Sequence, residues 1–208
     1  MPAETHLPQI EWRAACESGA CPVCHLAGKR TAKYLDSLLW EHVTDREFRY
    51  AFRAAGGFCQ GHSRDLDSFR DGLAVAILHR DILGDRLEAF RKKKAFKSKA
   101  PCVICKERER VEKTYFTLLS ESAGAERAAF EASAGLCVPH YGKFLSQVRR
   151  PPKWITEIQE GAYRDLMRRV DVFIDYSAFG RDADFATLSP EDKTVWKELA
   201  RALRSDFP

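Results

Sequence analysis

Apolar side chains in this chain recur at helical spacing over long segments, and no segment alternates as a half-buried strand does. Over residues 22–43, hydrophobic positions follow one another at intervals of three and four, as on one face of a helix. The same spacing extends over 71–92 and 153–178, and a shorter stretch, 4–20, shows it more weakly. This pattern predicts an all-α fold.

For the two longest predicted helices the pattern also indicates which face should be buried, because an amphipathic helix packs its apolar stripe against the core. In the helix over 71–92 the predicted stripe is Leu73, Ile77, Leu83, Leu87 and Phe90. In the helix over 153–178 it is Trp154, Ile158, Ala162, Leu166, Val170, Phe173 and Ile174.

Local signals predict several helix ends. Thr44 and Glu47 have the spacing of a capping box, which starts a helix. The Gly-Gly pair at 56–57 should end that helix, since glycine adopts the left-handed C-cap conformation at little cost. Residues 179–188 are predicted to form a loop, and the Ser-Pro pair at 189–190 should begin a last helix.

One series of motifs occurs twice along the chain. Each copy has a CxxC pair, then a helical insert, then a GxCxxH element. The first copy runs from Cys21 to His62 and the second from Cys102 to His140. Aromatic and leucine positions within the inserts also align, and the long helices that follow share similar centres. The repeat predicts two homologous helical modules.

The predicted module boundary lies near residue 100. The first module, 1–100, includes an N-terminal helix and the basic connector at 91–99. The second module, 101–208, includes an additional C-terminal helix.

Three thiolates and one imidazole per module form a ligand set that structural zinc sites use. The sequence therefore predicts two zinc ions per chain, one in each module, with four protein ligands apiece. A site filled by four protein ligands is structural rather than catalytic. The predicted ligands are Cys21, Cys24, Cys59 and His62 in the first module, and Cys102, Cys105, Cys137 and His140 in the second.

The remaining cysteine, Cys16, lies outside the repeat, because Lys97 occupies the equivalent place before the second CxxC pair. With Cys21, Cys24 and Cys59, it has the spacing of plant-type ferredoxins, and an iron–sulfur cluster is the alternative cofactor. That spacing leaves His62 unused and does not recur in the second half. A Cys3His cluster in each half stays open.

Other uses of the cysteines fit the sequence less well. The string Cys21 to His25 matches a haem-attachment motif, but attachment requires export and the second copy lacks the histidine. A redox CxxC pair is expected in a βαβ context, which is missing here. Buried free cysteines would not account for two CxxC and two CxxH pairs in matching order.

Charge and composition limit the partners. The 208 residues have a formal net charge of +4, which permits an acidic partner without requiring one. The basic run at 91–99 could bind phosphates, but a solvated helix end is favoured over a nucleic-acid site. No apolar run is long enough to span a bilayer. The N-terminus lacks the pattern of a secretory signal, so the prediction is a cytoplasmic protein with reduced thiols.

The order CPVC, helix, GGFCxxH and a long helix with an RDIL-like centre, followed by a second copy, resembles an uncharacterised bacterial family of duplicated Cys/His helical proteins. The resemblance covers roughly residues 20–205 and supports ligand pairing within each half, but the family is a domain of unknown function and implies no reaction.

The sequence contains no nucleophile elbow, P-loop or HExxH motif. We therefore expect a non-enzymatic zinc protein that acts as an adaptor or accessory factor with an unknown protein partner. A redox or iron–sulfur protein and a nucleic-acid-binding protein are the alternatives.

Overall fold

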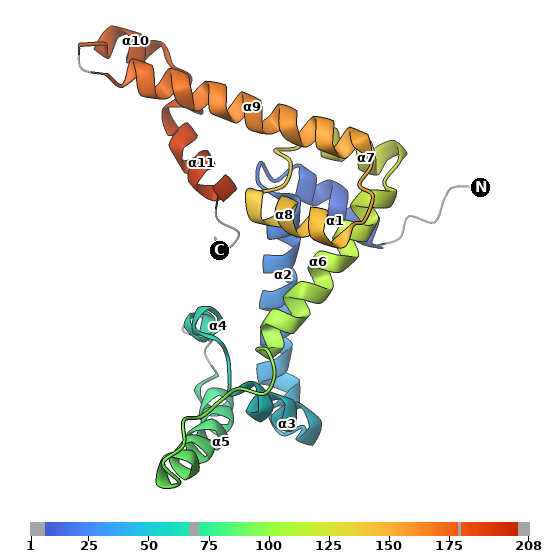
Figure 1. Ribbon diagram of the computed structural model, residues 1–208, viewed down its shortest axis with the longest axis vertical. Coiled ribbons are helices and arrows are strands. Elements are labelled where there is room, and N and C mark those ends of the chain that lie inside the picture. Colours follow the sequence, from blue (N-terminus) through green and yellow to red (C-terminus); the bar gives the residue numbers. More distant parts are fainter. Residues whose placement is uncertain (1–6, 67–70, 179, 204–208) are drawn as a thin grey trace. The chain divides into compact units, whose positions relative to one another are not determined.

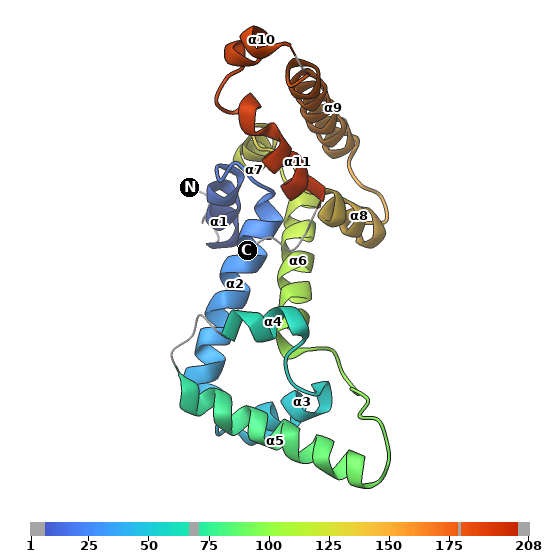
Figure 2. The same ribbon diagram turned by 90° about the vertical axis from the view of Figure 1, so that its left-hand side faces the viewer.

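The computed structural model describes residues 7–66, 71–178 and 180–203, and every regular element within these ranges is helical (Figures 1 and 2). The all-α prediction is confirmed, and two Cys3His groups are present. The elements are α1 (Leu7–Cys16), α2 (Pro22–Ser37), the π-helical turn η1 (Leu38–His42), α3 (Arg46–Ala55), α4 (Gln60–Asp65), α5 (Gly72–Arg91), α6 (Val103–Glu121), α7 (Gly124–Glu131), α8 (Val138–Gln147), α9 (Lys153–Tyr176), α10 (Asp182–Thr187), the 3₁₀ turn η3 (Asp192–Thr194) and α11 (Val195–Leu203).

Residue contacts divide the chain into two compact units that do not coincide with the two halves of the sequence. One unit is continuous, Ala27–Val111, and is called the central unit below. The other combines Met1–Leu26 with Glu112–Pro208 and is called the terminal unit. The boundaries fall inside α2 and α6, whereas the predicted module boundary falls near residue 100.

The central unit has its core between α3, α5 and the end of α2. Phe52 of α3 is fully buried, and its ring meets that of Phe58 edge-on at a centroid distance of 4.8 Å. Leu78 and Ile82 of α5 pack into the same cluster. Two ion pairs on the flank of this contact join the helices: Arg49 binds Asp81, and Arg53 binds Asp85. Figures 1 and 2 show α3 beside α5.

The predicted buried stripe of α5 is wrong. The helix buries Ala74, Leu78 and Ile82, while Leu73, Leu83, Leu87 and Phe90 are exposed and Ile77 is half-buried. Apolar residues lie on both sides of this helix, so spacing alone does not select the inner face. The inner face is the one on which Leu78 and Ile82 pack against Phe52, and Asp81 and Asp85 beside it pair with Arg49 and Arg53 of α3.

The terminal unit is built around aromatic side chains. Trp12 of α1 is fully buried, with its ring stacked between those of Tyr115, at 6.1 Å, and Phe130, at 5.9 Å. Its indole nitrogen donates to the carbonyl oxygen of Glu126 at 3.3 Å, which joins α1 to α7. Phe116 of α6 packs edge-on against the ring of Phe144 of α8.

Helix α9 packs against the terminal unit, and its buried residues coincide only in part with the predicted apolar stripe. Leu166 and Val170 are buried, as predicted, together with Ile155 and Gln159. Ile174 is exposed, and the remaining predicted positions, Trp154, Ile158, Ala162 and Phe173, are half-buried. The stripe is therefore displaced by one residue at the start of the helix.

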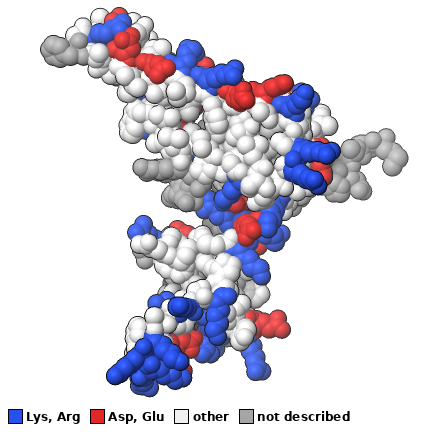
Figure 3. Space-filling view, in the orientation of Figure 1, with Lys and Arg blue, Asp and Glu red and all other residues white. Residues whose placement is uncertain are grey.

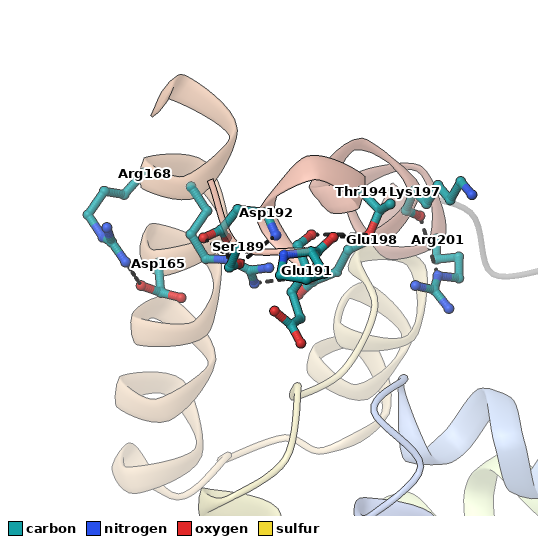
Figure 4. Close-up of polar contacts among 11 residues, drawn as sticks. Asp165, Arg168, Ser189, Glu191, Asp192, Thr194, Lys197, Glu198 and Arg201 are labelled. Carbon is teal, nitrogen blue, oxygen red and sulfur yellow. Dashed lines mark hydrogen bonds and ion pairs between the residues drawn. The ribbon is translucent and has the colours of Figure 1, made fainter. Parts of the chain in front are cut away.

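The C-terminal segment returns to α9 through ion pairs (Figure 4). Arg169 of α9 donates to Asp192 at 2.8 Å and to Glu198 at 2.9 Å. The Ser189 hydroxyl accepts from the backbone N–H of Asp192 at 3.0 Å, as a capping serine does, and the last helix begins as a 3₁₀ turn. The apolar contact between α9 and α11 centres on Val195, which is fully buried.

Two local predictions need correction. The segment 179–188 contains helix α10, Asp182–Thr187, rather than loop alone. Helix α3 is capped by Asp45, whose side chain accepts from the N–H of Phe48, and not by Thr44. The predicted end of α3 is confirmed, because Gly56 has φ +74° and acts as a left-handed C-cap.

The inner face of α5 can be tested by a matched pair of substitutions. Leu78→Ala should lower the free energy of unfolding by about 2–5 kcal/mol, because it leaves a cavity in the core. Leu83→Ala, on the exposed face of the same helix, should change it by less than about 0.5 kcal/mol. Urea denaturation followed by circular dichroism measures both. A larger loss for Leu83→Ala would contradict the observed orientation.

Candidate metal centres

The donor atoms of all eight predicted ligands gather into two groups, and within each group they lie within 4.8 Å of one another. The predicted pairing within each half is wrong, because each group takes its CxxC pair from one half and its CxxH pair from the other. The first centre is Cys21, Cys24, Cys137 and His140, and the second centre is Cys59, His62, Cys102 and Cys105.

This exchange agrees with the compact units. Both ligand pairs of the first centre lie in the terminal unit, and both ligand pairs of the second centre lie in the central unit. Each CxxC or CxxH pair supplies only two ligands, so a four-coordinate centre needs two pairs, and here each centre combines one pair of each kind. The two CxxH pairs are chemically equivalent, and their choice of partner depends on packing that the motif does not encode.

Each pair sits at the beginning of a helix. The first cysteine of every pair immediately precedes the helix, and the second ligand lies in its first turn. The carbonyl of each first cysteine accepts the opening helical hydrogen bond, as the backbone of an N-cap residue does. These bonds are His25 N to Cys21 O, Ser63 N to Cys59 O, Lys106 N to Cys102 O, and Tyr141 N to Cys137 O.

Helix starts suit these ligands for two reasons. Ligands three residues apart in the first turn lie on one face, so both can bind one ion. In the longer helices α2, α6 and α8, the positive end of the helix dipole also favours a thiolate over a thiol.

The first centre has the dimensions of a tetrahedral site. A single zinc ion, with bonds of about 2.3 Å to sulfur and 2.0–2.1 Å to nitrogen, separates two sulfurs by about 3.8 Å and a sulfur from a nitrogen by about 3.6 Å. The Sγ atoms of Cys24 and Cys137 are 3.6 Å apart. The Nδ1 of His140 lies 3.2 Å from each of these sulfurs and 3.5 Å from that of Cys21.

The second centre has closely similar dimensions. The Sγ atoms of Cys59 and Cys105 are 3.7 Å apart. The Nδ1 of His62 lies 3.2 Å from Cys59, 3.5 Å from Cys105 and 3.7 Å from Cys102. Both centres therefore present the Nδ1 atom of their histidine to the shared point, which leaves Nε2 to face outward.

At the first centre that outward nitrogen has a buried carboxylate partner. His140 Nε2 donates to Glu112 Oε1 at 3.1 Å, and the side chain of Glu112 is 2% exposed. Lys143 donates to both oxygens of Glu112, at 3.1 and 2.9 Å. Burial alone would raise the pKa of Glu112, but the hydrogen bonds from His140 and Lys143 outweigh burial and lower the pKa to about 2.

The Glu112 carboxylate fixes the histidine for metal binding. Because Nε2 carries the proton that it donates to Glu112, the lone pair of Nδ1 faces the three sulfurs. Glu112 and Lys143 could not be recognised from the sequence. Glu112 lies on α6 and Lys143 on α8, and neither stands at a spacing from the ligands that belongs to a known motif. Only folding brings the two side chains together.

A buried glutamine holds the loop that carries Cys137. Gln159 of α9 accepts from the N–H of Leu136 at 2.7 Å and donates to the carbonyl of the same residue at 3.0 Å. Gly135 must stay without a side chain there, because its φ is +71° and a Cβ atom would lie 3.0 Å from the Gln159 amide. Helix α9 thus positions the CxxH element through backbone contacts.

The thiols of the first centre affect one another's ionisation. Hydrogen bonding with Cys137 and Cys21, together with burial, raises the pKa of Cys24. Hydrogen bonds from Cys21 and Cys24 lower the pKa of Cys137. Thiolates this close repel one another, and a bound dication offsets that repulsion.

Cys16 belongs to neither centre. Its side chain is buried, and burial, with smaller contributions from Cys21 and Glu17, raises the pKa of its thiol to about 12. A thiol held in this protonated form is a poor metal ligand, since the thiolate is the form that binds. The ferredoxin-like set of Cys16, Cys21, Cys24 and Cys59 is not assembled, because Cys59 lies in the second centre.

Comparison with known proteins finds a relative of unknown function. A protein of Caldicellulosiruptor sp. (strain Rt8B.4), described as an uncharacterized 23.9 kDa protein in the xynA 3' region, is 32% identical over 135 residues. The match covers 61% of this chain and 66% of that protein. The resemblance to an uncharacterised family is confirmed. No family description matches the chain, and no solved structure matches it.

Surface charge shows a local basic cluster at the end of α5. Lys and Arg side chains gather there, whereas basic and acidic side chains intermingle over α9 (Figure 3). The residues at the end of α5, Arg91 to Lys94, are all exposed, and Lys92 pairs with Glu88. No helix in the described ranges is both long and apolar enough to cross a bilayer.

The exchanged pairing can be tested by replacing the bound metal with ¹¹³Cd and recording its scalar couplings to cysteine Hβ protons. One cadmium signal should couple to Cys21, Cys24 and Cys137, because their sulfurs share one ion. The other should couple to Cys59, Cys102 and Cys105. Cys16 provides the internal control and should show no coupling. A cadmium coupled to Cys21, Cys24 and Cys59 together would contradict the observed grouping.

Proposed function

We propose that this chain is a non-enzymatic zinc protein of the cytoplasm, in which two structural Cys3His centres hold the fold and the folded surface serves as an adaptor for another protein. The observation that carries the proposal is that four donor atoms meet at each centre, and the distances between them are those expected around a tetrahedral metal ion. Four protein ligands leave no position for water or substrate, which a catalytic zinc keeps open.

The donor distances support a single ion over an iron–sulfur cluster. In an iron–sulfur cluster the four protein ligands are divided among two or four irons, so together they surround a larger core than one ion. Here the sulfur–sulfur distances of 3.6 and 3.7 Å fit sulfurs that share one metal. Three thiolates with one imidazole are typical of structural zinc sites.

The surroundings of the first centre support a structural role. The buried acid nearest to the ligands, Glu112, is held by His140 and Lys143 and orients the imidazole. A general base would instead need a free carboxylate within reach of a metal-bound water. Metal binding is then linked to folding, because each ion closes a chain segment that the small unit would otherwise close by packing alone.

The adaptor role rests on the exposed apolar side chains. Leu83, Leu87 and Phe90 on the outer side of α5, and Trp40 in η1, are all about half-exposed or more. Large apolar side chains grouped on a surface are typical of protein interaction sites.

Elemental analysis of anaerobically purified protein tests the proposal. It should give about two zinc ions per chain and a colourless solution, since zinc has no visible absorption. Cys59→Ser should reduce zinc to about one ion per chain, because it removes a ligand of the second centre. The matched variant Cys16→Ser should retain two.

Strong chelation should also lower the thermal midpoint and the helix content, because the ions support the fold. Iron with a brown colour would establish the cluster alternative instead. Metal-dependent turnover in a protein that stays fully folded without metal would contradict the structural role.

A further inference from the structure

The two centres use the same ligand types but differ in their exposure. In the first centre Cys21, Cys137 and His140 are buried, with His140 0% exposed, and Cys24 is half-buried. In the second centre Cys102 is buried, while Cys59, His62 and Cys105 are half-buried. Reagents in solution therefore reach more of the ligands of the second centre than of the first.

The centres also differ in what supports the histidine. The repeat register that aligns Cys21 with Cys102 aligns Thr31 with Glu112. The Thr31 hydroxyl is used within its own helix, donating to the carbonyl of Ala27 at 2.8 Å. No hydrogen bond to His62 Nε2 is found among the described residues, so within the ranges 7–66, 71–178 and 180–203 the second centre has no counterpart of the Glu112–Lys143 pair.

A cavity of about 390 Å³ adjoins the second centre. Two of the ligands, Cys59 and Cys102, form part of its lining, together with Arg86 and Phe96. The guanidinium of Arg86 lies 5.2 Å from the centre of the Phe96 ring and donates to the carbonyl of Gly56, which holds this wall of the cavity. At the first centre the ring of Phe116 instead covers His140 edge-on.

From these differences we propose that the two ions have different tasks: the first centre holds its metal permanently, and the second exchanges its metal with small thiol or chelating ligands. The inference rests on the proposed function, since it requires both centres to bind zinc. In the exchange, an incoming thiolate forms a bond to zinc, a bond from zinc to a cysteine Sγ breaks, and the released thiolate takes a proton from water. No oxidation is involved.

The greater exposure of the second centre and the Glu112 carboxylate at the first centre both favour faster metal exchange at the second centre. An associative exchange needs room for the incoming ligand at the metal, which the cavity beside Cys59 and Cys102 supplies. A carboxylate behind a ligating histidine typically strengthens metal binding by about 10–100-fold, and in the part of the chain that the structure describes, only the first centre has one.

The test is the release of zinc from the fully loaded chain to an excess of a chromophoric chelator at neutral pH. Two phases of equal amplitude are expected, one zinc ion each, with the fast rate at least about tenfold above the slow rate. Alkylation with iodoacetamide, mapped by mass spectrometry during the fast phase, should modify Cys59 and Cys105 before the buried Cys21 and Cys137.

Substitution behind the histidine identifies the cause. Glu112→Gln should accelerate the slow phase by about 10–100-fold and leave the fast phase unchanged. Glu121→Gln, an exposed position on the same helix, is the matched control and should change neither phase. Circular dichroism verifies that both variants are folded. The order of alkylation in the chain without substitutions tests the inference independently of any variant.

Release of both ions in one phase, or alkylation of Cys21 and Cys137 as early as that of Cys59 and Cys105, would overturn the inference while leaving the zinc protein intact. A slow phase that Glu112→Gln does not accelerate would overturn the role given to Glu112. A chain that carries no zinc at the start would instead refute the proposed function, so the two failures are distinguishable.

Discussion

A four-coordinate ion needs four donors at the corners of a tetrahedron, and a pair of ligands three residues apart can supply only two of them. The rest of this structure depends on how four such pairs are combined. By exchanging pairs, the chain joins Cys24 to Cys137 across 113 residues and Cys59 to Cys105 across 46. Cross-links that close long segments remove the most freedom from the unfolded chain. An ion bound at each group would thereby connect helices from both halves.

The helical class and the eight donor residues that gather into two groups could be predicted because both depend on local patterns. Helical periodicity needs only neighbouring residues, and a CxxC or CxxH pair is defined within one turn. The pairing could not be predicted, because Cys59 and Cys137 are equivalent as ligands and the choice between them is made by packing. The same limit applied to α5, where apolar residues occupy both faces. The buried face follows from packing against α3, where Asp81 and Asp85 also pair with arginines of that helix.

The residues that support the first centre show a second limit of local patterns. Glu112 on α6 would be assigned to a solvated helix face from the sequence alone, yet it is buried against His140 and Lys143. Gln159 likewise binds the backbone of Leu136 from a position where an apolar residue would be expected. Buried polar side chains of this kind are satisfied by distant partners, and those partners carry no signature in the sequence.

The crossed pairing has a consequence for synthesis. A ribosome releases the chain from its N-terminus, so Cys21, Cys24, Cys59 and His62 all emerge before Cys102 exists. Those four residues are a complete Cys3His set by themselves, although the finished protein divides them between two centres. An ion captured by the nascent first half would occupy a non-native site and would have to leave before both native centres could form. Metal that arrives after translation is complete, or that stays exchangeable until then, avoids this non-native site.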